Sequence, residues 1–212
     1  MMYLHEVFSS IQGEGYDTGI PTTFVRFYGC NLKCKYCDQP QKSSDCQRSS
    51  IDRIVREVRS HGLTNVCITG GEPLIQKDIY PLVYELCSLG YRVNIETNGS
   101  IPLQDVGYVR SYKYIMDIKC PSSGESDHNH YPNMKILHHT DEVKFVIADR
   151  NDYDFMKKVL RDYPTKARIL VSPMFDKDNK QTIAQDLVKW MVEDRENRMK
   201  LQLQIHKFIN VQ

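Results

Sequence analysis

The order of hydrophobic and polar residues along the chain predicts short strands that alternate with amphipathic helices. Short runs rich in β-branched and aromatic residues, bounded by turn-forming residues, are typical of buried strands. Because helical patterns separate these runs, the sequence indicates an α/β fold with a mostly parallel sheet built from βα units. The predicted strands are residues 23–27, 65–69, 92–97, 114–119, 142–147, 168–172 and 201–206.

Four segments between these strands have the periodicity of amphipathic helices. In residues 51–60, Ile54, Val55 and Val58 fall on one face, and Ser50 is placed to cap the first turn. This segment is therefore predicted to be a helix that packs one face on the sheet. The other predicted helices are residues 79–88, 153–161 and 182–197, and the polar stretches 39–50 and 121–133 are predicted loops.

Length and charge narrow the class of protein. The chain has 212 residues, enough for a substantial core, and we expect one domain over residues 1–212. With 28 basic and 27 acidic residues it is nearly neutral, which argues against nucleic-acid binding and favours a small ligand. No apolar run is long enough to cross a bilayer, and the amino terminus lacks the pattern of a signal peptide. Membrane association is therefore not expected.

Three cysteines, Cys30, Cys34 and Cys37, follow the first predicted strand with the spacing C-x3-C-x2-C. Three thiolates can bind three corners of a 4Fe-4S cubane and leave the fourth iron open, whereas a cluster that only relays electrons usually has four cysteine ligands. An open iron can bind a small molecule through its amino and carboxylate groups and pass it one electron. S-adenosylmethionine suits this chemistry, and the spacing is the signature of the radical S-adenosylmethionine (radical SAM) enzymes.

A zinc site and buried free thiols are the alternatives for this triplet. Structural zinc sites usually combine two C-x2-C pairs, or one pair with histidines, and the sequence has no second pair. The cluster is therefore the favoured interpretation. An odd number of cysteines together with an oxidation-sensitive cluster indicates the reducing cytoplasm. The other cysteines are scattered and are interpreted as small buried hydrophobic residues: Cys46, Cys67, Cys87 and Cys120.

Other candidate motifs also lie where predicted strands end. In a parallel barrel, ligands gather at the carboxyl ends of the strands. Glycines at this edge let the backbone approach a ligand closely, and their carbonyl groups can accept bonds from an ammonium group. The motifs are Thr69-Gly70-Gly71-Glu72-Pro73 after one strand, Glu96-Thr97-Asn98-Gly99 at the end of the next, and Ser172-Pro173-Met174 at the end of a later one.

Together, the cysteine triplet, Gly-Gly-Glu-Pro and Thr-Asn-Gly resemble the radical SAM superfamily, whose core is a full or partial βα barrel. The amino-terminal segments 6–15 (Glu-Val-Phe-Ser-Ser-Ile-Gln-Gly-Glu-Gly) and 19–27 are similar to the 7-carboxy-7-deazaguanine synthase family. The expected fold is therefore a partial, incomplete βα barrel. Further segments that resemble this family are residues 117–124, 143–146, 171–174 and 204–207, so the resemblance spans nearly the whole chain.

The resemblance implies a ring contraction of 6-carboxy-5,6,7,8-tetrahydropterin to 7-carboxy-7-deazaguanine, with loss of ammonia, in queuosine and deazapurine biosynthesis. A 5′-deoxyadenosyl radical would take hydrogen from the carbon that bears the carboxylate, and the hydrogen would return after the rearrangement. S-adenosylmethionine would therefore be reformed. The resemblance also implies a homodimer, and the one-electron step requires a donor such as flavodoxin or ferredoxin.

The resemblance implies that substrate and S-adenosylmethionine have separate sets of ligands. Arg26 and Thr69 would be the catalytic-site residues that bind the pterin, with Arg26 paired to its carboxylate, because a guanidinium fork suits a carboxylate in a dry site. Its place between Val25 and Phe27 also fits an edge-strand arginine that faces solvent. Ile11, Gln12 and Gly13 would contact the pterin. The residues implied for S-adenosylmethionine are Tyr36, Cys37, Asp38, Gly71, Lys119, Cys120, Pro121, Ser122, Ser172, Pro173, Met174 and Phe175.

His206 is a further candidate for the pterin site. With Lys207 it ends the last predicted strand, at the edge of the sheet where ligands are expected. The alternative is a surface pair at the end of that strand.

Gln39 departs from the pattern of the family, which usually has threonine directly after Cys-Asp. The threonine hydroxyl helps to hold a magnesium ion against the substrate. A glutamine carbonyl oxygen is a donor that a hard cation accepts, but the longer side chain must fold back to reach the same place. Magnesium binding at Gln39 is therefore in doubt, and the substitution leaves open another cation, no cation, or a different substrate preference.

Two rival functions belong to other classes. The first is an activase that installs a glycyl radical on a partner protein and consumes S-adenosylmethionine; such proteins share the cysteine spacing but are not expected to have Ile-Gln-Gly-Glu-Gly. The second is a non-catalytic protein that keeps an iron-sulfur cluster or zinc for partner binding. Assay with the tetrahydropterin separates all three.

Overall fold

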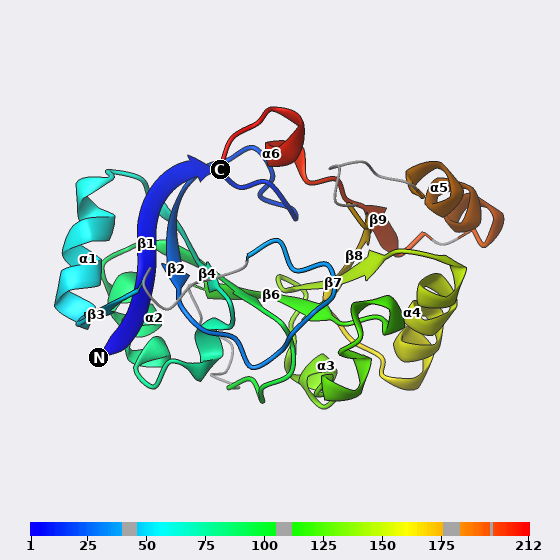
Figure 1. Ribbon diagram of the computed structural model, residues 1–212, viewed down its shortest axis with the longest axis horizontal. Helices are drawn as coiled ribbons and strands as arrows, with labels where there is room; N and C mark the ends of the chain where they lie inside the picture. Colours follow the sequence, from blue (N-terminus) through cyan, green and yellow to red (C-terminus); the bar gives the residue numbers. More distant parts are fainter. Residues whose placement is uncertain (40–45, 105–111, 176–182, 196) are drawn as a thin grey trace.

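One curved nine-stranded sheet with helices on its outer side forms the described part of this computed structural model, which covers residues 1–39, 46–104, 112–175, 183–195 and 197–212 (Figure 1). The strand order is β3-β1-β2-β4-β5-β6-β7-β8-β9. From β2 to β9 all neighbours are parallel, whereas β1 is antiparallel to β2 and β3. The strands are β1 (Met2–Ile11), β2 (Pro21–Phe27), β3 (Gln47–Ser49), β4 (Asn65–Gly70), β5 (Arg92–Thr97), β6 (Tyr112–Ile118), β7 (Glu142–Ile147), β8 (Arg168–Pro173) and β9 (Met199–Leu201).

The helices α1, α2, α4 and α5 pack outside the curve of the sheet (Figure 1). In α1 the Ser50 side chain accepts a hydrogen bond from the Arg53 amide at 3.3 Å, and Ile54, Val55 and Val58 are buried, as the sequence pattern predicts. The α-helices are α1 (Ile51–Ser60), α2 (Ile79–Ser88), α3 (Asn133–Ile136), α4 (Arg150–Asp162), α5 (Ala184–Glu193) and α6 (Ile205–Phe208).

The parallel strands form the core of the molecule. Their central residues are apolar on both faces, because helices cover one face and the interior of the curve is filled by side chains from the other. Phe27, Ile68, Ile95, Tyr114 and Phe145 are all fully or almost fully buried. This packing fixes the strands and therefore the positions of the loops at their carboxyl ends.

Two predictions about local structure are wrong, and one strand is not predicted at all. Residues 2–11 form the long strand β1, although their polar and apolar residues show no regular alternation. Residues 47–49 lie in a predicted loop but pair with the start of β1. The last predicted strand is misplaced: the pairing with β8 ends at Leu201, and Ile205 begins the short helix α6. The helix predicted at residues 182–197 begins at Ala184 and ends at Glu193 in the described residues.

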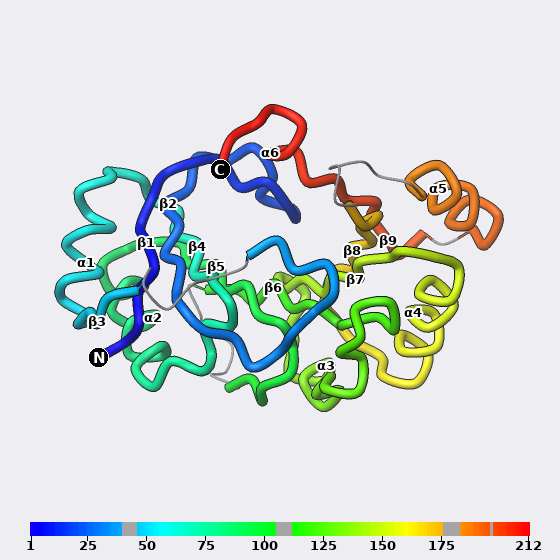
Figure 2. Tube along the Cα trace, viewed as in Figure 1, coloured from blue at the N-terminus to red at the C-terminus, as the bar shows by residue number. Residues whose placement is uncertain are grey.

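The segment between β1 and β2, residues 12–20, folds inward across the amino ends of the parallel strands; we call it the floor loop. Asp17 accepts a hydrogen bond from Asn94 near the start of β5 at 2.9 Å and pairs with Lys113 of β6 at 3.0 Å. The amide of Tyr16 donates to Glu142, the first residue of β7, at 3.2 Å. Figure 2 shows this loop beside α6. The floor loop therefore closes the end of the sheet opposite the cysteine loop.

Candidate functional site

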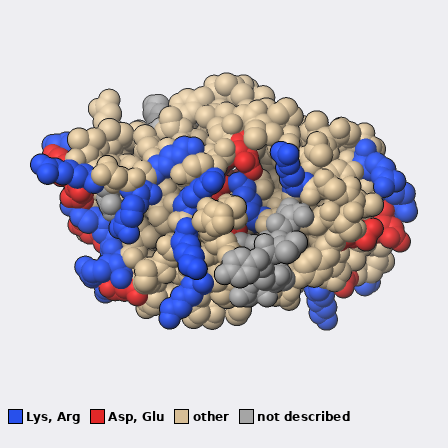
Figure 3. All heavy atoms as spheres, turned by 180° about the vertical axis from the view of Figure 1, so that it is seen from behind, with Lys and Arg blue, Asp and Glu red and all other residues tan. Residues whose placement is uncertain are grey.

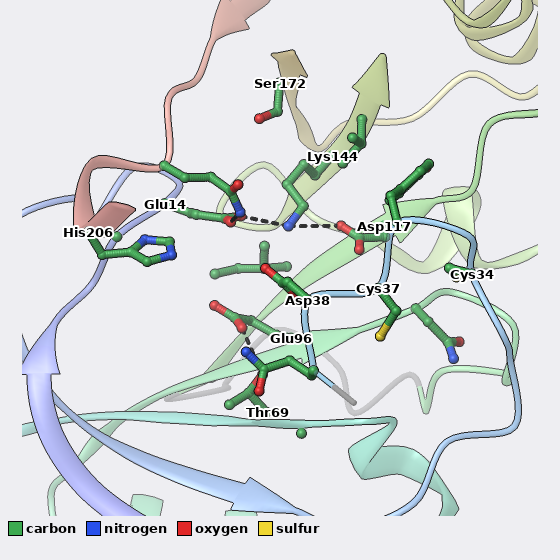
Figure 4. A pocket seen from close by; sticks show the side chains of 18 of the residues that line it. Glu14, Cys34, Cys37, Asp38, Thr69, Glu96, Asp117, Lys144, Ser172 and His206 are labelled. Carbon is green, nitrogen blue, oxygen red and sulfur yellow. Dashed lines mark hydrogen bonds and ion pairs between the residues drawn. The ribbon is translucent and has the colours of Figure 1, made fainter. Parts of the chain in front are cut away.

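A cavity of about 260 Å³ lies inside the curve of the sheet (Figure 4). Its walls come from β1, β2 and β4 to β8, its floor from the floor loop, and its mouth from the cysteine loop (residues 29–39) and α6. Residues far apart in sequence thus meet in one enclosure. All the motifs that the sequence predicts at strand ends contribute to it: Thr69, Gly70 and Gly71; Glu96, Thr97 and Asn98; and Ser172, Pro173 and Met174.

The cysteine loop leaves β2 at its carboxyl end, and Cys30, Cys34 and Cys37 all line the cavity. Buried Leu32 anchors the loop, and the amide of Lys35 bonds the Ser123 carbonyl at 3.0 Å. All three thiols are free; those of Cys30 and Cys37 are exposed and that of Cys34 is half-buried. Burial raises the pKa of the Cys34 thiol, and the positive charge of Lys119 opposes this rise. A bound metal cation would lower the pKa of this thiol and favour the thiolate.

The three cysteines fit a 4Fe-4S cluster. A cubane places each thiolate on a different iron, so the sulfurs need not converge on one point. Among the described residues, no three His, Cys, Asp or Glu side chains are grouped closely enough to hold a single metal ion. The donors are three accessible sulfurs on one loop at the edge of a cavity, which matches a cluster with one open iron.

Gly71 and Glu72 join the cysteine loop to the ends of β4 and β5. A Cβ atom at Gly71 would lie 2.2 Å from the Gly29 carbonyl oxygen, so the close backbone contact requires glycine. Glu72 is fully buried and accepts hydrogen bonds from the amide of Asn98 at 2.6 Å and the hydroxyl of Thr97 at 2.9 Å. Burial raises the pKa of Glu72 to about 7, although these hydrogen bonds oppose the rise. Its carboxyl group is a structural brace rather than a ligand-facing acid.

Arg26 lines the cavity wall and does not face solvent, since only 14% of its side chain is exposed. Its guanidinium bonds Glu6 at 2.7 Å and lies 4.9 Å from the centre of the Phe8 ring. Its Nε is buried and has no hydrogen-bond partner among the described residues. The edge-strand alternative is therefore wrong, because β1 covers β2 on that side. Arg26 can offer part of its guanidinium to an anion in the cavity.

Polar side chains at the bottom of the cavity converge on Glu96. Its carboxylate accepts a hydrogen bond from Gln12 Nε2 at 3.2 Å and another from Thr69 Oγ1 at 2.8 Å. Burial raises the pKa of Glu96, and the negative charge of Glu14 adds to this rise. Glu96 was not predicted as a site residue, although it lies in the motif at the end of β5.

A buried chain of charges lies beside Glu96 (Figure 4). Lys144 pairs with Glu14 at 2.6 Å and with Asp117 at 3.2 Å, and Asp117 also pairs with Lys119 at 2.7 Å. Burial alone would raise the pKa of Asp117, but Lys119 and Lys144 bring it below its usual value. Asp117 and Glu14 likewise raise the pKa of Lys144 well above its usual value against the effect of burial. All four groups are therefore charged at neutral pH.

The side of the cavity near the carboxyl terminus is formed by α6. His206 lies against Gly13, where an added Cβ would meet its Nδ1 at 1.9 Å, and burial lowers the pKa of this histidine. Lys207 pairs with Asp38 at 3.2 Å and lies 4.7 Å from the centre of the Phe175 ring. Both residues line the cavity, as predicted, but they lie on α6 and not at the end of a strand.

Most of the predicted site residues meet in this cavity. Three predicted residues do not line it: Cys120 is fully buried, Pro121 is exposed, and Ser122 donates hydrogen bonds to Asp152 at the start of α4. Cys67 is buried as predicted, whereas Cys46 and Cys87 are only partly buried. The predicted residues that line the cavity are Ile11, Gln12, Gly13, Arg26, Cys30, Cys34, Tyr36, Cys37, Asp38, Gln39, Thr69, Gly71, Lys119, Ser172, Pro173, Met174, Phe175 and His206.

The outer surface is consistent with the near-neutral sequence. Figure 3 shows basic and acidic side chains interspersed on the face seen from behind. Within the described residues, the helices are all too short or too polar to span a membrane.

Comparisons with known proteins agree on one family. Residues 24–185 match the model of the radical SAM superfamily. A 7-carboxy-7-deazaguanine synthase of Methanospirillum hungatei JF-1 is 41% identical over 214 residues, which cover 99% of this chain and 86% of the relative. The enzyme of the same name from Koribacter versatilis is 39% identical over 223 residues, covering 98% of this chain and 96% of the relative.

Solved structures support the fold. The crystal structure of QueE from Escherichia coli matches with a TM-score of 0.72 at 21% identity, covering 96% of this chain and 93% of that chain. SuiB of Streptococcus suis, solved with bound S-adenosylmethionine, matches with a TM-score of 0.55 at 14% identity and covers 81% of this chain and 47% of that chain. The expected partial βα barrel with a mostly parallel sheet is therefore confirmed.

Proposed function

Since this chain belongs to the 7-carboxy-7-deazaguanine synthase family of the radical SAM superfamily, we propose how its cavity carries out the reaction of that family. The proposed reaction converts 6-carboxy-5,6,7,8-tetrahydropterin to 7-carboxy-7-deazaguanine with loss of ammonia, as a step of queuosine biosynthesis. The name of the relatives gives the product, and the substrate and the lost ammonia are those that the sequence resemblance implies. The observation that carries the proposal is that one cavity is lined both by the three cysteines and by Arg26.

The mouth of the cavity holds the cofactors. Cys30, Cys34 and Cys37 would hold the 4Fe-4S cluster, and the bound cluster would supply the electron for the radical chemistry of S-adenosylmethionine. A small electron-transfer protein such as flavodoxin or ferredoxin supplies the electron, and the enzyme acts as a homodimer. Cys120, Pro121 and Ser122 follow Lys119 in the chain but do not line the cavity, so they are not among the proposed contacts. The proposed contacts of S-adenosylmethionine are Tyr36, Cys37, Asp38, Gly71, Lys119, Ser172, Pro173, Met174 and Phe175, all of which line the cavity.

The pterin lies below, between Arg26 and the floor loop. Arg26 binds the carboxylate through the part of its guanidinium that Glu6 does not use. Glu96 and Gln12 offer hydrogen-bond acceptors and donors side by side, which suits the amino-pyrimidinone edge of a pterin. The Thr69 hydroxyl holds Glu96 in place by donating a hydrogen bond to it. Ile11 at the end of β1, Gly13 of the floor loop and His206 of α6 pack against the ring.

The charges around the ring also determine where protons are held. Glu96 has a raised pKa and is placed to exchange a proton with the pterin edge. Lys144 stays protonated between Glu14 and Asp117 and can donate hydrogen bonds to nitrogen or oxygen atoms of a ligand without giving up its proton. The enclosure excludes water from the reacting carbon atoms.

The residues next to Asp38 do not fit a magnesium ion. Mg²⁺ prefers carboxylate and water oxygens in octahedral geometry. Gln39 offers a neutral amide, and the adjacent carboxylate of Asp38 is already paired with the ammonium of Lys207. A positive group at this distance would repel a divalent cation. No step of the proposed reaction at this site therefore uses magnesium.

An anaerobic assay tests the proposal. The reconstituted protein, with a chemical reductant, S-adenosylmethionine and the carboxy-tetrahydropterin, is expected to form 7-carboxy-7-deazaguanine and an equal amount of ammonia. An activase would instead consume S-adenosylmethionine without changing the pterin, and a non-catalytic protein would do neither. Either result would overturn the proposed function.

A further inference from the structure

The part of the cavity next to Asp38 and Gln39 contains a lysine, Lys207, that the proposed reaction does not use. Lys207 on α6 reaches across the mouth, lines the cavity and has only 18% of its side chain exposed. Its ammonium lies over the face of Phe175, at 4.7 Å from the ring centre, so an aromatic ring restricts its position. The charge is thus held at the place where Gln39 replaces the usual threonine.

Lys207 differs from the other two lysines of the cavity in its partner. Lys119 and Lys144 bind the largely buried carboxylates of Asp117 and Glu14, so their charges are already matched inside the protein. The partner of Lys207 is Asp38, and 52% of that side chain is exposed to solvent. Ion pairs with an exposed partner contribute little stability, and solvent can replace the partner at small cost. Lys207 is therefore the lysine of this cavity that can most readily turn to a ligand.

We propose that the ammonium of Lys207 binds the carboxylate of the pterin and provides the positive charge that a divalent cation would otherwise provide beside residue 39. This inference rests on the proposed function, because the ligand is the carboxylate of that substrate. Asp38 keeps Lys207 oriented in the free enzyme, and the incoming carboxylate takes its place or shares the ammonium. An ammonium has three donors and no geometric demand for six ligands, so Gln39 need not contribute an oxygen.

The chain is suited to this arrangement because α6 is held on both sides. The Ile205 amide bonds the Gly13 carbonyl of the floor loop at 3.1 Å, and Phe208 stacks edge-on against Phe175 with ring centres 5.8 Å apart. Gln212, at the carboxyl terminus, donates to Glu6, the partner of Arg26, at 2.9 Å. The segment that carries Lys207 thus contacts the floor loop and the partner of Arg26.

Equilibrium binding to the cluster-loaded enzyme, without reductant, tests the proposal. Two pterins are compared, the carboxy-tetrahydropterin and a tetrahydropterin without the carboxylate, and S-adenosylmethionine serves as a third ligand. Lys207→Met is expected to weaken binding of the carboxylated pterin about 10- to 100-fold and to change binding of the other two less than about threefold. Lys207→Arg should recover most of the loss. Lys189→Met, an exposed lysine on α5, is the matched control.

Magnesium titration supplies the second arm of the test. The wild type should bind the carboxylated pterin with little response to Mg²⁺, whereas Lys207→Met, and more strongly Gln39→Thr with Lys207→Met, should bind it more tightly as Mg²⁺ rises. A strong magnesium requirement for binding in the wild type would overturn the proposal. A loss of affinity in Lys207→Met that is equal for both pterins, or largest for S-adenosylmethionine, would also overturn it. If the wild type binds neither pterin, the proposed function fails as well, which is a distinguishable result.

Discussion

The side-chain amide of Asn98 donates a hydrogen bond to Sγ of Cys30, at an N–S distance of 3.7 Å. Glu72 places Asn98 by accepting its backbone amide at 2.6 Å, so the Gly-Gly-Glu-Pro and Thr-Asn-Gly motifs both act on the first cysteine of the triplet. Hydrogen bonds to ligand sulfurs tune the potential of an iron-sulfur cluster. The two motifs therefore support the cluster as well as line the cavity.

Asn98→Leu is expected to lower the reduction potential of the cluster by a few tens of millivolts. The lost donor stabilised the added negative charge of the reduced state, and for one electron 59 mV corresponds to a tenfold change in the equilibrium. Redox titration followed by electron paramagnetic resonance measures this shift. Asn65→Leu, at the start of β4, is the control. An unchanged potential in Asn98→Leu would mean that Asn98 only shapes the loop.

The cysteines separate into ligands and structural residues. Replacing Cys30, Cys34 or Cys37 by alanine is expected to abolish turnover and to reduce iron and sulfide content, since two thiolates hold a cubane poorly. Cys87→Ala, a partly buried position on α2, is the matched control and should keep its cluster. Cys46, Cys67 and Cys120 should tolerate replacement in the same way. Normal iron content after loss of any one of the three would contradict the assignment.

Arg26→Lys keeps the positive charge but loses the planar fork. Binding of the carboxy-tetrahydropterin should weaken by roughly 10- to 100-fold, the effect of one charge-assisted hydrogen bond, while S-adenosylmethionine binding stays nearly constant. Calorimetric titration of the two ligands measures this difference. Equal losses for both ligands would show that Arg26, through Glu6 and Phe8, has a purely structural role.

Lys113 holds the floor loop from outside the cavity. It pairs with Asp17 at 3.0 Å and with buried Glu142, which also accepts the Tyr16 amide. Lys113→Met should lower the melting temperature, because Glu142 is left buried without its counter-ion. Pterin affinity should fall by about three- to tenfold as Gln12 and Gly13 lose their fixed positions. Lys113→Arg should restore part of the melting temperature and part of the pterin affinity. An equal loss of S-adenosylmethionine affinity in Lys113→Met would argue against a selective effect on the floor loop.

Local patterns account for much of the fold. Helix α1 has a continuous stripe of apolar residues on one face and a serine at its N-cap, and its predicted bounds agree with the structure. The sequence 201–206 alternates as a strand does, yet its pairing with β8 ends at Leu201 and the Gln202 amide, and the chain turns into α6 at Ile205. Alternation indicates a possible strand, but a neighbouring strand must be present to pair with it. Strand β1 shows the converse, since pairing on both sides overrides an irregular pattern.

The site was predictable where its residues are contiguous or end a strand. The cysteine triplet and the motifs of β4, β5 and β8 are of this kind. Glu14, Asp117 and Lys144 are different, because they lie far apart in sequence and meet only when the floor loop folds into the sheet. The sequence predicts Lys207, together with His206, either as part of the pterin site or as a surface pair at the end of a strand, and its contact with Asp38 depends on the position of α6. No local pattern encodes such pairings.

The fate of one hydrogen atom distinguishes catalytic use of S-adenosylmethionine from its consumption. The reaction is run with carboxy-tetrahydropterin deuterated at the carbon that bears the carboxylate, and S-adenosylmethionine is recovered after many turnovers and examined by mass spectrometry. The expected result is that 7-carboxy-7-deazaguanine forms, that deuterium appears in the 5′ position of S-adenosylmethionine, and that this cofactor is not depleted. Accumulation of one 5′-deoxyadenosine for each product, with no deuterium in the remaining S-adenosylmethionine, would contradict it.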